Sequence, residues 1–308
     1  MKKILGATSL AALLLLPAGR IVSAAGVGTT GAQFLKVGVG ARPLAMGGAF
    51  SALADDANAI NWNPGALAES KQKNVTASYN SLFQDQSQGF VGYANPLKDD
   101  MGTLGVGLNY LTVSKIEKRA TDTETADSTF SNENFALSLS YARSEVKKGL
   151  SLGGSIKFVR TALDSFSGNA VALDFGALYK TPVENLTTGV SVRNMGTKIG
   201  PDPLPLTLKG GAAYKLFDRK LALAADIDWL AVDQRAYLGL GAEYWLQKIL
   251  AIRAGYQFGR GQDQLGNRTL LGVGLGLGLQ LERFSLDYAF VPFGNLGDTH
   301  RMTVGMRF

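Results

Sequence analysis

Cysteine is absent from this chain of 308 residues, and histidine occurs only once, at His300. Without cysteine there are no disulfides, no Cys-ligated metals and no thiol catalysis. Any Ser-His-Asp triad or histidine-bound metal would have to include His300, and no acid–base constellation accompanies that residue in the sequence. We therefore predict that the protein is not an enzyme and that it has no metal site and no cofactor.

Long apolar runs are also missing. The mean hydropathy is only +0.06, and no segment after residue 24 offers the roughly 20 uncharged apolar residues of a membrane-spanning helix. Long runs of Lys and Arg are missing too, so we expect no nucleic-acid partner. A closed β-barrel remains as the way to cross lipid with every backbone group paired.

Residues 1–24 have the parts of a secretory signal peptide. Lys2 and Lys3 are basic, residues 10–16 form a short apolar core, and residues 22–24 (Val-Ser-Ala) offer small side chains for cleavage. The apolar core is too short for a membrane anchor. Cleavage after residue 24 would also remove Arg20 and lower the formal net charge from +6 to +3. We therefore expect export through a cleaved signal peptide.

From about residue 74 onward, apolar residues alternate with small or polar ones in segments separated by turns. Leu275, Leu277 and Leu279, for example, alternate with glycines, and Phe90 is assigned to the same outward-facing set. This period of two is what a barrel wall between lipid and lumen requires. The prediction is an all-β fold, a transmembrane antiparallel β-barrel of about 14 strands over residues 71–308. An even number of strands places both ends of the barrel on the periplasmic side.

The inward-facing positions favour a wet lumen over the core of a soluble β-protein, which is the alternative. Asp226, Asp228, Glu243 and Arg253 fall on this face and carry charges of both signs. The polar residues 115–132 predict a long outer loop, because extracellular loops are longer than periplasmic turns. The short periplasmic turns are predicted at 95–100, 144–149, 217–219 and 246–248.

The last strand alternates up to the final residue, Phe308. It resembles the closing strand of bacterial outer-membrane barrels, whose terminal aromatic residue is read by the barrel assembly machinery. The resemblance implies that Phe308 is an assembly signal, that the location is the bacterial outer membrane, and that the partners include outer-membrane lipid and the barrel assembly machinery.

Residues 25–70 are rich in Gly and Ala and show little period-two order. They predict a compact segment that folds tightly against another surface and ends in an Asn-Pro turn. Three short motifs stand out in this segment. They contain Gly40, Ala41, Arg42, Met46 and Gly47, then Asp55 and Asp56, then Trp62, Asn63 and Pro64.

These motifs resemble the start of the FadL-like outer-membrane proteins, most closely the PorV/PorQ branch. In that branch the corner reads Trp-Asn-Pro-Ala-Gly-Leu, whereas here Gly65 precedes Ala66. The resemblance spans the chain after the signal peptide. It implies that residues 25–70 fold into the lumen of the barrel as a hatch.

The resemblance leaves two functions open. FadL-like proteins imply passage of hydrophobic small molecules across the outer membrane, and the apolar hatch residues would then contact such a ligand. These candidates are Phe34, Leu35, Leu44, Met46 and Phe50, although each is equally compatible with packing that seats the hatch. PorV-like proteins imply an accessory of type IX-like protein secretion that binds exported proteins. The extracellular loops are of modest length, which favours passage of small molecules over protein binding, and we therefore expect transport.

Overall fold

The computed structural model describes residues 29–83, 85–259, 271–293 and 297–308. The expected signal peptide, residues 1–24, lies outside these residues. In the described part of the chain, no helix is long and apolar enough to cross a membrane.

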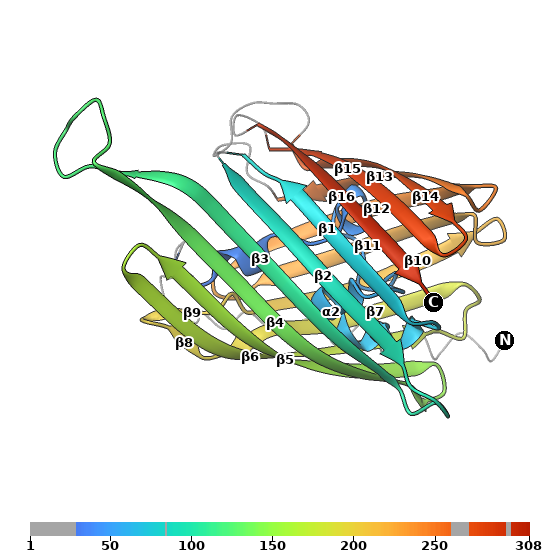
Figure 1. Ribbon diagram of the computed structural model, residues 1–308. Helices are drawn as coiled ribbons and strands as arrows, with labels where there is room; N and C mark the ends of the chain where they lie inside the picture. The colour runs from blue at the N-terminus through green and yellow to red at the C-terminus, as the bar shows by residue number, and fades with distance from the viewer. Residues whose placement is uncertain (1–28, 84, 260–270, 294–296) are drawn as a thin grey trace.

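Fourteen strands of the described chain form one closed antiparallel barrel, as the alternation predicted (Figure 1). The ring closes where β1 (Asn74–Ser81) pairs with β16 (Asp298–Arg307). A small hairpin of β8 (Lys198–Ile199) and β9 (Asp202–Pro203) lies outside the ring, so that β7 pairs with β10. The other strands of the ring are β2 (Gln86–Pro96), β3 (Thr103–Lys118), β4 (Ser128–Lys147), β5 (Leu150–Leu163), β6 (Phe166–Lys180), β7 (Leu186–Gly196), β10 (Thr207–Leu216), β11 (Leu221–Leu230), β12 (Arg235–Leu246), β13 (Leu250–Phe258), β14 (Val273–Leu281) and β15 (Phe284–Pro292).

The outer face of the barrel is apolar, whereas the inner face carries small, polar and charged residues. Leu275 and Leu277 of β14 are exposed on the outside, and Gly274 and Gly276 beside them are covered inside. Exposed aromatic side chains near the strand ends, such as Trp229, are typical of the girdles that mark the membrane interfaces. The pattern therefore fits a wall with lipid on one side and a filled lumen on the other.

The assignment of Phe90 to the outer face was wrong. Phe90 is only 2% exposed and belongs to the central core with Ile60, and Val91 is the residue of β2 that points outward. The hatch brings apolar side chains into the lumen, so an inward-facing aromatic finds a dry partner there. Glycine precedes Phe90 and follows Val91, so the immediate neighbours do not mark the inner face, but the buried polar residue Gln88 lies two positions before Phe90 on the same face.

The two ends of the barrel differ. At the end where β1 begins and β16 ends, the strands are joined by the short segments 97–102, 148–149, 181–185, 217–220, 247–249 and 282–283. We call this the termini end and the opposite end the loop end. Single-chain outer-membrane barrels keep both ends of the barrel and their short turns on the periplasmic side, so we expect the termini end to be periplasmic and the loop end to face outward.

Half of the long loop predicted at 115–132 is strand. β3 continues to Lys118 and β4 begins at Ser128, so only residues 119–127 connect them. The neighbouring strands end earlier, because β2 pairs with β3 only up to Val113 and β5 pairs with β4 only from Asn132. Residues 114–131 therefore form a two-stranded ribbon beyond the rim, drawn in green in Figure 1. Backbone pairing of Ile116 with Phe130 holds the ribbon together, which the polar composition did not reveal.

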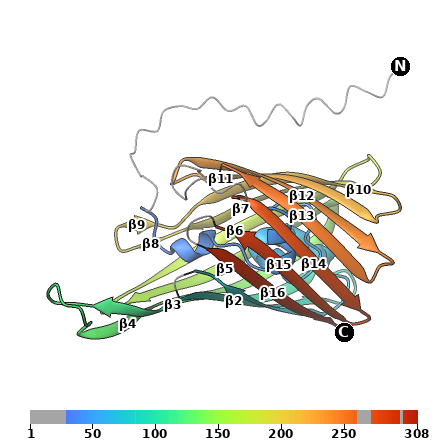
Figure 2. The ribbon, with the colours of Figure 1, turned by 90° about the horizontal axis from the view of Figure 1, so that it is seen from above.

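Residues 29–70 lie inside the barrel as the hatch, drawn in blue in Figures 1 and 2. The hatch begins at the loop end, where the Gly31 amide donates to the Pro203 carbonyl of β9 at 2.9 Å, and it leads into β1 at the termini end. Most of its apolar side chains are buried in one core with inward-facing residues of the wall. Its helical turns are η2 (Gln33–Lys36), α1 (Ala41–Ala45), α2 (Ala59–Trp62) and η3 (Pro64–Glu69).

A charge on the outer wall should destabilise the barrel according to its depth in the bilayer. Leu277 lies in the middle of β14 and Leu281 at its periplasmic end, and their exposures are nearly equal at 52% and 54%. Leu277→Arg should cost about 2–4 kcal/mol of unfolding free energy in lipid vesicles, and the control Leu281→Arg about 1 kcal/mol or less. Equal losses in guanidinium titrations would contradict this placement in the membrane.

Candidate functional site in the barrel lumen

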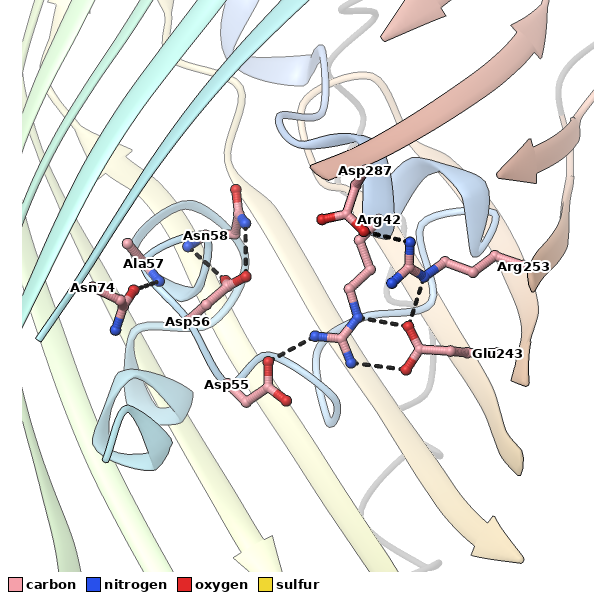
Figure 3. A network of polar contacts seen from close by, with 9 residues as sticks. All are labelled: Arg42, Asp55, Asp56, Ala57, Asn58, Asn74, Glu243, Arg253 and Asp287. Carbon is pink, nitrogen blue, oxygen red and sulfur yellow. Dashed lines mark hydrogen bonds and ion pairs between the residues drawn. The ribbon is translucent and has the colours of Figure 1, made fainter. Parts of the chain in front are cut away.

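Buried charged groups attach the hatch to the barrel wall, and the first cluster centres on Arg42 (Figure 3). Arg42 donates to both carboxylate oxygens of Glu243 on β12, at 2.7 and 2.9 Å, and to Asp55 at 2.7 Å. Glu243 also accepts from Arg253 at 2.6 Å, and Arg253 donates to Asp287 at 2.6 Å. This cluster joins two parts of the hatch to three strands of the wall.

The cluster keeps Arg42 charged. Burial alone would lower the pKa of its guanidinium, but the carboxylates of Asp55 and Glu243 more than offset this effect and raise the pKa well above its ordinary value. The paired, bidentate geometry suits a guanidinium, because its planar fork matches a carboxylate. Lysine at position 42 could not reproduce both contacts to Glu243.

A second cluster centres on Asp226 of β11. Its carboxylate accepts hydrogen bonds from the Phe50 and Ser51 amides and from the Ser51 hydroxyl, each at 2.8 Å. Lys209 of β10 lies 3.1 Å from the same carboxylate and donates to the Gly48 carbonyl at 2.8 Å. Asp226 and Lys209 thus satisfy backbone groups of the hatch that have no partner in a helix or strand.

The predicted Asn-Pro corner locks the hatch onto β6. The Asn63 side chain accepts from the Gly65 amide at 3.0 Å, which caps η3, and it donates to the Ser51 carbonyl at 2.8 Å and the Ala177 carbonyl at 3.1 Å. A Cβ on Gly65 would lie 2.6 Å from the Gly176 backbone. The order Gly65-Ala66, which departs from the family corner, is therefore the order that lets this corner approach the wall.

Glycines of the lumen provide the room for α1 and the turn that follows it. A Cβ on Gly47, whose φ is +62°, would lie 2.6 Å from the backbone of β13. A Cβ on Gly274 would overlap the Leu44 carbonyl, and one on Gly276 would lie 2.5 Å from a side chain of α1. The alternating glycines of β14 therefore permit backbone contact between the wall and the hatch.

Asp55 and Asp56 adjoin the Arg42 cluster but have different partners. Asp55 binds Arg42, whereas Asp56 accepts from the amide and the side chain of Asn58 at 2.9 and 3.0 Å (Figure 3). Withdrawal from water inside the barrel, and then the adjacent charge of Asp55, raise the pKa of Asp56 to about 6. Asp56 can therefore take up a proton under mildly acidic conditions.

A cavity of about 350 Å³ lies on the loop-end side of the hatch. Leu35, Leu44 and Trp62 contribute apolar surface, whereas Lys36, Asp233 and other charged residues of the rim contribute polar surface. Lys36 and Asp233 form an ion pair of 2.6 Å at this site. The cavity is thus lined by charges of both signs as well as by apolar groups.

The five predicted ligand contacts are not brought together. Leu35 and Leu44 line the cavity. Met46 and Phe50 are fully buried in the central core, and Phe34 packs in a separate core cluster. Leu35 and Leu44 are therefore the two candidates that a molecule in this cavity could touch, and the ligand-contact role of all five stays a prediction.

His300 lies on the outer face of β16, where it shares a 2.7 Å hydrogen bond with the Tyr288 hydroxyl. In the part of the chain that the structure describes, no three His, Asp or Glu side chains are placed to hold a metal ion. The lumen is instead organised by ion pairs. Sequence reasoning placed Asp226 on the inner face but did not include Lys209, although the two residues pair across the neighbouring strands β10 and β11.

Loss of the Asp226 charge should loosen the hatch. Asp226→Asn removes the charged acceptor of three hydrogen bonds and leaves Lys209 undercompensated, which should cost about 3 kcal/mol. Because the chain has no cysteine, the substitution Ala52→Cys at a buried position reports hatch opening through the maleimide labelling rate. We expect this rate to rise about a hundredfold, with Asp218→Asn in an exposed turn as the unaffected control. An unchanged rate would show that Asp226 does not anchor the hatch.

Hatch seating should also depend on pH through Asp56. Its pKa is about 6 in the seated hatch against an ordinary value of 3.8, so the seated state holds the proton more tightly. The contribution of Asp56 to the stability of the seated hatch is fully present below pH 3.8, falls as pH rises towards 6, and is lost above about 6. Maleimide labelling of the Ala52→Cys protein, normalised to an exposed Ser165→Cys protein, should thus be slower at about pH 5 than at about pH 7.5. Asp56→Asn should abolish this difference, and an identical pH profile in both proteins would contradict the assignment.

The barrel is similar to solved transporters of aromatic hydrocarbons. The toluene transporter TbuX of Ralstonia pickettii is 14% identical with a TM-score of 0.61, and the match covers 88% of this chain and 98% of that one. The toluene transporter TodX of Pseudomonas putida is 16% identical with a TM-score of 0.59, covering 87% and 96%. At these identities the similarity shows a shared fold. No curated protein matches the sequence significantly.

The family comparison is more specific. The model of the family described as "Type IX secretion system protein PorV" matches residues 23–232. The matched region includes the whole described hatch with its Arg42 and Asn63 motifs and continues to the end of β11, which is more than half of the chain. On this match, together with a barrel of the FadL-like fold, the protein belongs to the PorV family of outer-membrane β-barrels.

Proposed function

We propose that this barrel is a non-enzymatic accessory of protein secretion that holds exported proteins at the outer membrane. The observation that carries the proposal is the ribbon of residues 114–131, which extends the wall beyond the rim at the loop end. A conduit for small molecules has no need of such a projection, whereas a protein-binding accessory needs a surface that reaches past the lipid. Membership of the PorV family supports the same function.

The lumen supports this proposal as well. The hatch is attached to the wall through Arg42 and Asp226, and each strand of the ring pairs with both neighbours. Sites for hydrophobic molecules are mostly apolar with few polar groups, whereas the cavity above the hatch is bordered by several charged residues, including Arg193 and Asp228. The arrangement favours a closed barrel over an open path for apolar solutes.

The ribbon offers an apolar contact beside its charges. Ile116 and Phe130 are paired across the two strands and are only partly covered. Aromatic and aliphatic anchors of this kind carry much of the binding energy in protein interfaces, whereas surrounding charges influence specificity and association rate. We therefore assign the exported protein to this pair and to the charged residues around it.

Passage of hydrophobic molecules is the second candidate. It is favoured by the cavity against Leu35, Leu44 and Trp62, and the structurally similar TodX and TbuX are described as toluene transporters. This route would require the hatch to move, because Arg42 and Asp226 attach it to the wall.

Mass spectrometry of the protein purified from outer membranes in mild detergent separates the two functions. The secretion accessory should carry exported polypeptides, and Ile116→Asp combined with Phe130→Ser should reduce them about tenfold or more, as expected for loss of a binding anchor. Phe166→Ser, at an exposed position beside the rim, is the control and should retain them. A stoichiometric apolar molecule that is lost in Leu35→Asp and Leu44→Asp, without any polypeptide, would instead establish transport.

A further inference from the structure

The two ends of this barrel carry opposite charge. The segments of the termini end are 69–73, 97–102, 143–149, 180–185, 215–220, 246–249, 281–284 and 307–308, and they contain thirteen basic and seven acidic residues. The described segments of the loop end are 82–83, 85–86, 113–133, 160–167, 196–206, 230–235, 292–293 and 297–298, and they contain six basic and ten acidic residues. Within the described segments, the excess of positive charge therefore lies at the termini end.

The basic residues at this end lie beside exposed apolar ones. Every turn of the termini end carries, in the turn or at its edge, a large apolar side chain that points into the surroundings, and Phe217 is the most exposed of them at 69%. Phe217 precedes Arg219 and Lys220, and Val146 precedes Lys147 and Lys148. The apolar residues of the six turns are Met101, Val146, Val183, Phe217, Ile249 and Phe284.

This combination is the chemistry of a surface that lies in a lipid headgroup region. Apolar side chains enter the boundary of the acyl chains, while Lys and Arg extend their charged groups to the phosphates. Basic residues at a membrane surface attract anionic lipids in particular. A soluble protein partner would require one contiguous patch, whereas here each of the six turns has an exposed apolar residue and a basic residue in the turn or at its edge.

We propose that the ring of basic and apolar side chains at the termini end binds anionic phospholipid headgroups of the periplasmic leaflet. The ligand is a phosphate-bearing lipid with a net negative charge, such as phosphatidylglycerol. The surface is separate from the ribbon at residues 114–131 and from the cavity above the hatch. Lipid binding at this surface does not depend on the proposed role in secretion. It fixes the depth and tilt of the barrel from below, while the acidic loop end stays free of this attraction.

The test compares a rim variant with a matched control in the full-length folded barrel. The rim variant is Lys147→Gln, Lys148→Gln, Arg219→Gln and Lys220→Gln, and the control removes the same number of charges at the loop end with Lys115→Gln, Lys118→Gln, Arg119→Gln and Lys198→Gln. Each protein is exchanged into equal mixtures of phosphatidylglycerol and phosphatidylcholine, passed through a mild detergent column, and analysed for retained lipid by mass spectrometry. Heat-modifiable migration on gels confirms that each barrel is folded.

We expect the unchanged protein and the control to retain phosphatidylglycerol over phosphatidylcholine, and this preference to weaken as salt is raised. In the rim variant, the ratio of retained phosphatidylglycerol to phosphatidylcholine should fall about fivefold for each removed charge that contacts a lipid. Equal retention of the two lipids by the unchanged protein would overturn the proposal. So would a rim variant that keeps the lipid preference but loses a co-purifying acidic polypeptide, because the basic ring would then serve a protein.

Discussion

The buried ion pairs between the wall and the hatch are the interactions on which this structure depends. A barrel of this size encloses a lumen, and the hatch that fills it brings backbone groups without helix or strand partners into a nearly dry interior. Asp226 accepts from the Phe50 and Ser51 amides of the hatch, and Glu243 accepts from the guanidinium of Arg42. A buried charge costs free energy unless it is paired and hydrogen-bonded. The buried charges of the wall therefore need their partners on the hatch, and those of the hatch need their partners on the wall.

Glycine makes this pairing possible at short range. Side-chain charges can meet only if the two backbones approach, and Gly47, Gly65 and Gly274 lie where a Cβ would collide with the opposing chain. Small residues on the hatch and on the inner wall therefore contribute, like the charges, to attaching the hatch to the wall. The outer wall has the reverse requirement, because lipid accepts large apolar side chains and rejects charge.

The division between the two ends follows from the same fold. The first and last strands both terminate at the termini end, because an even number of antiparallel strands returns the chain to the side where the barrel began. The ribbon projects at the opposite end, where β3 and β4 outlast their neighbours. On the two proposals made above, this PorV-family barrel presents its termini end to lipid headgroups and its ribbon to the cell exterior, with the hatch between them.

The barrel, its approximate strand number and the hatch could be predicted from the amino-acid sequence, because period-two alternation and the motifs around Arg42 and Asn63 are local patterns. The sequence also placed Asp226 and Glu243 on the inner face. The folded barrel was needed to learn which hatch groups those carboxylates bind, which apolar residues Phe90 packs against, and that residues 114–131 form a ribbon instead of a loop. These features depend on contacts between residues far apart in the chain, and a pattern of neighbours along the sequence carries no information about such contacts.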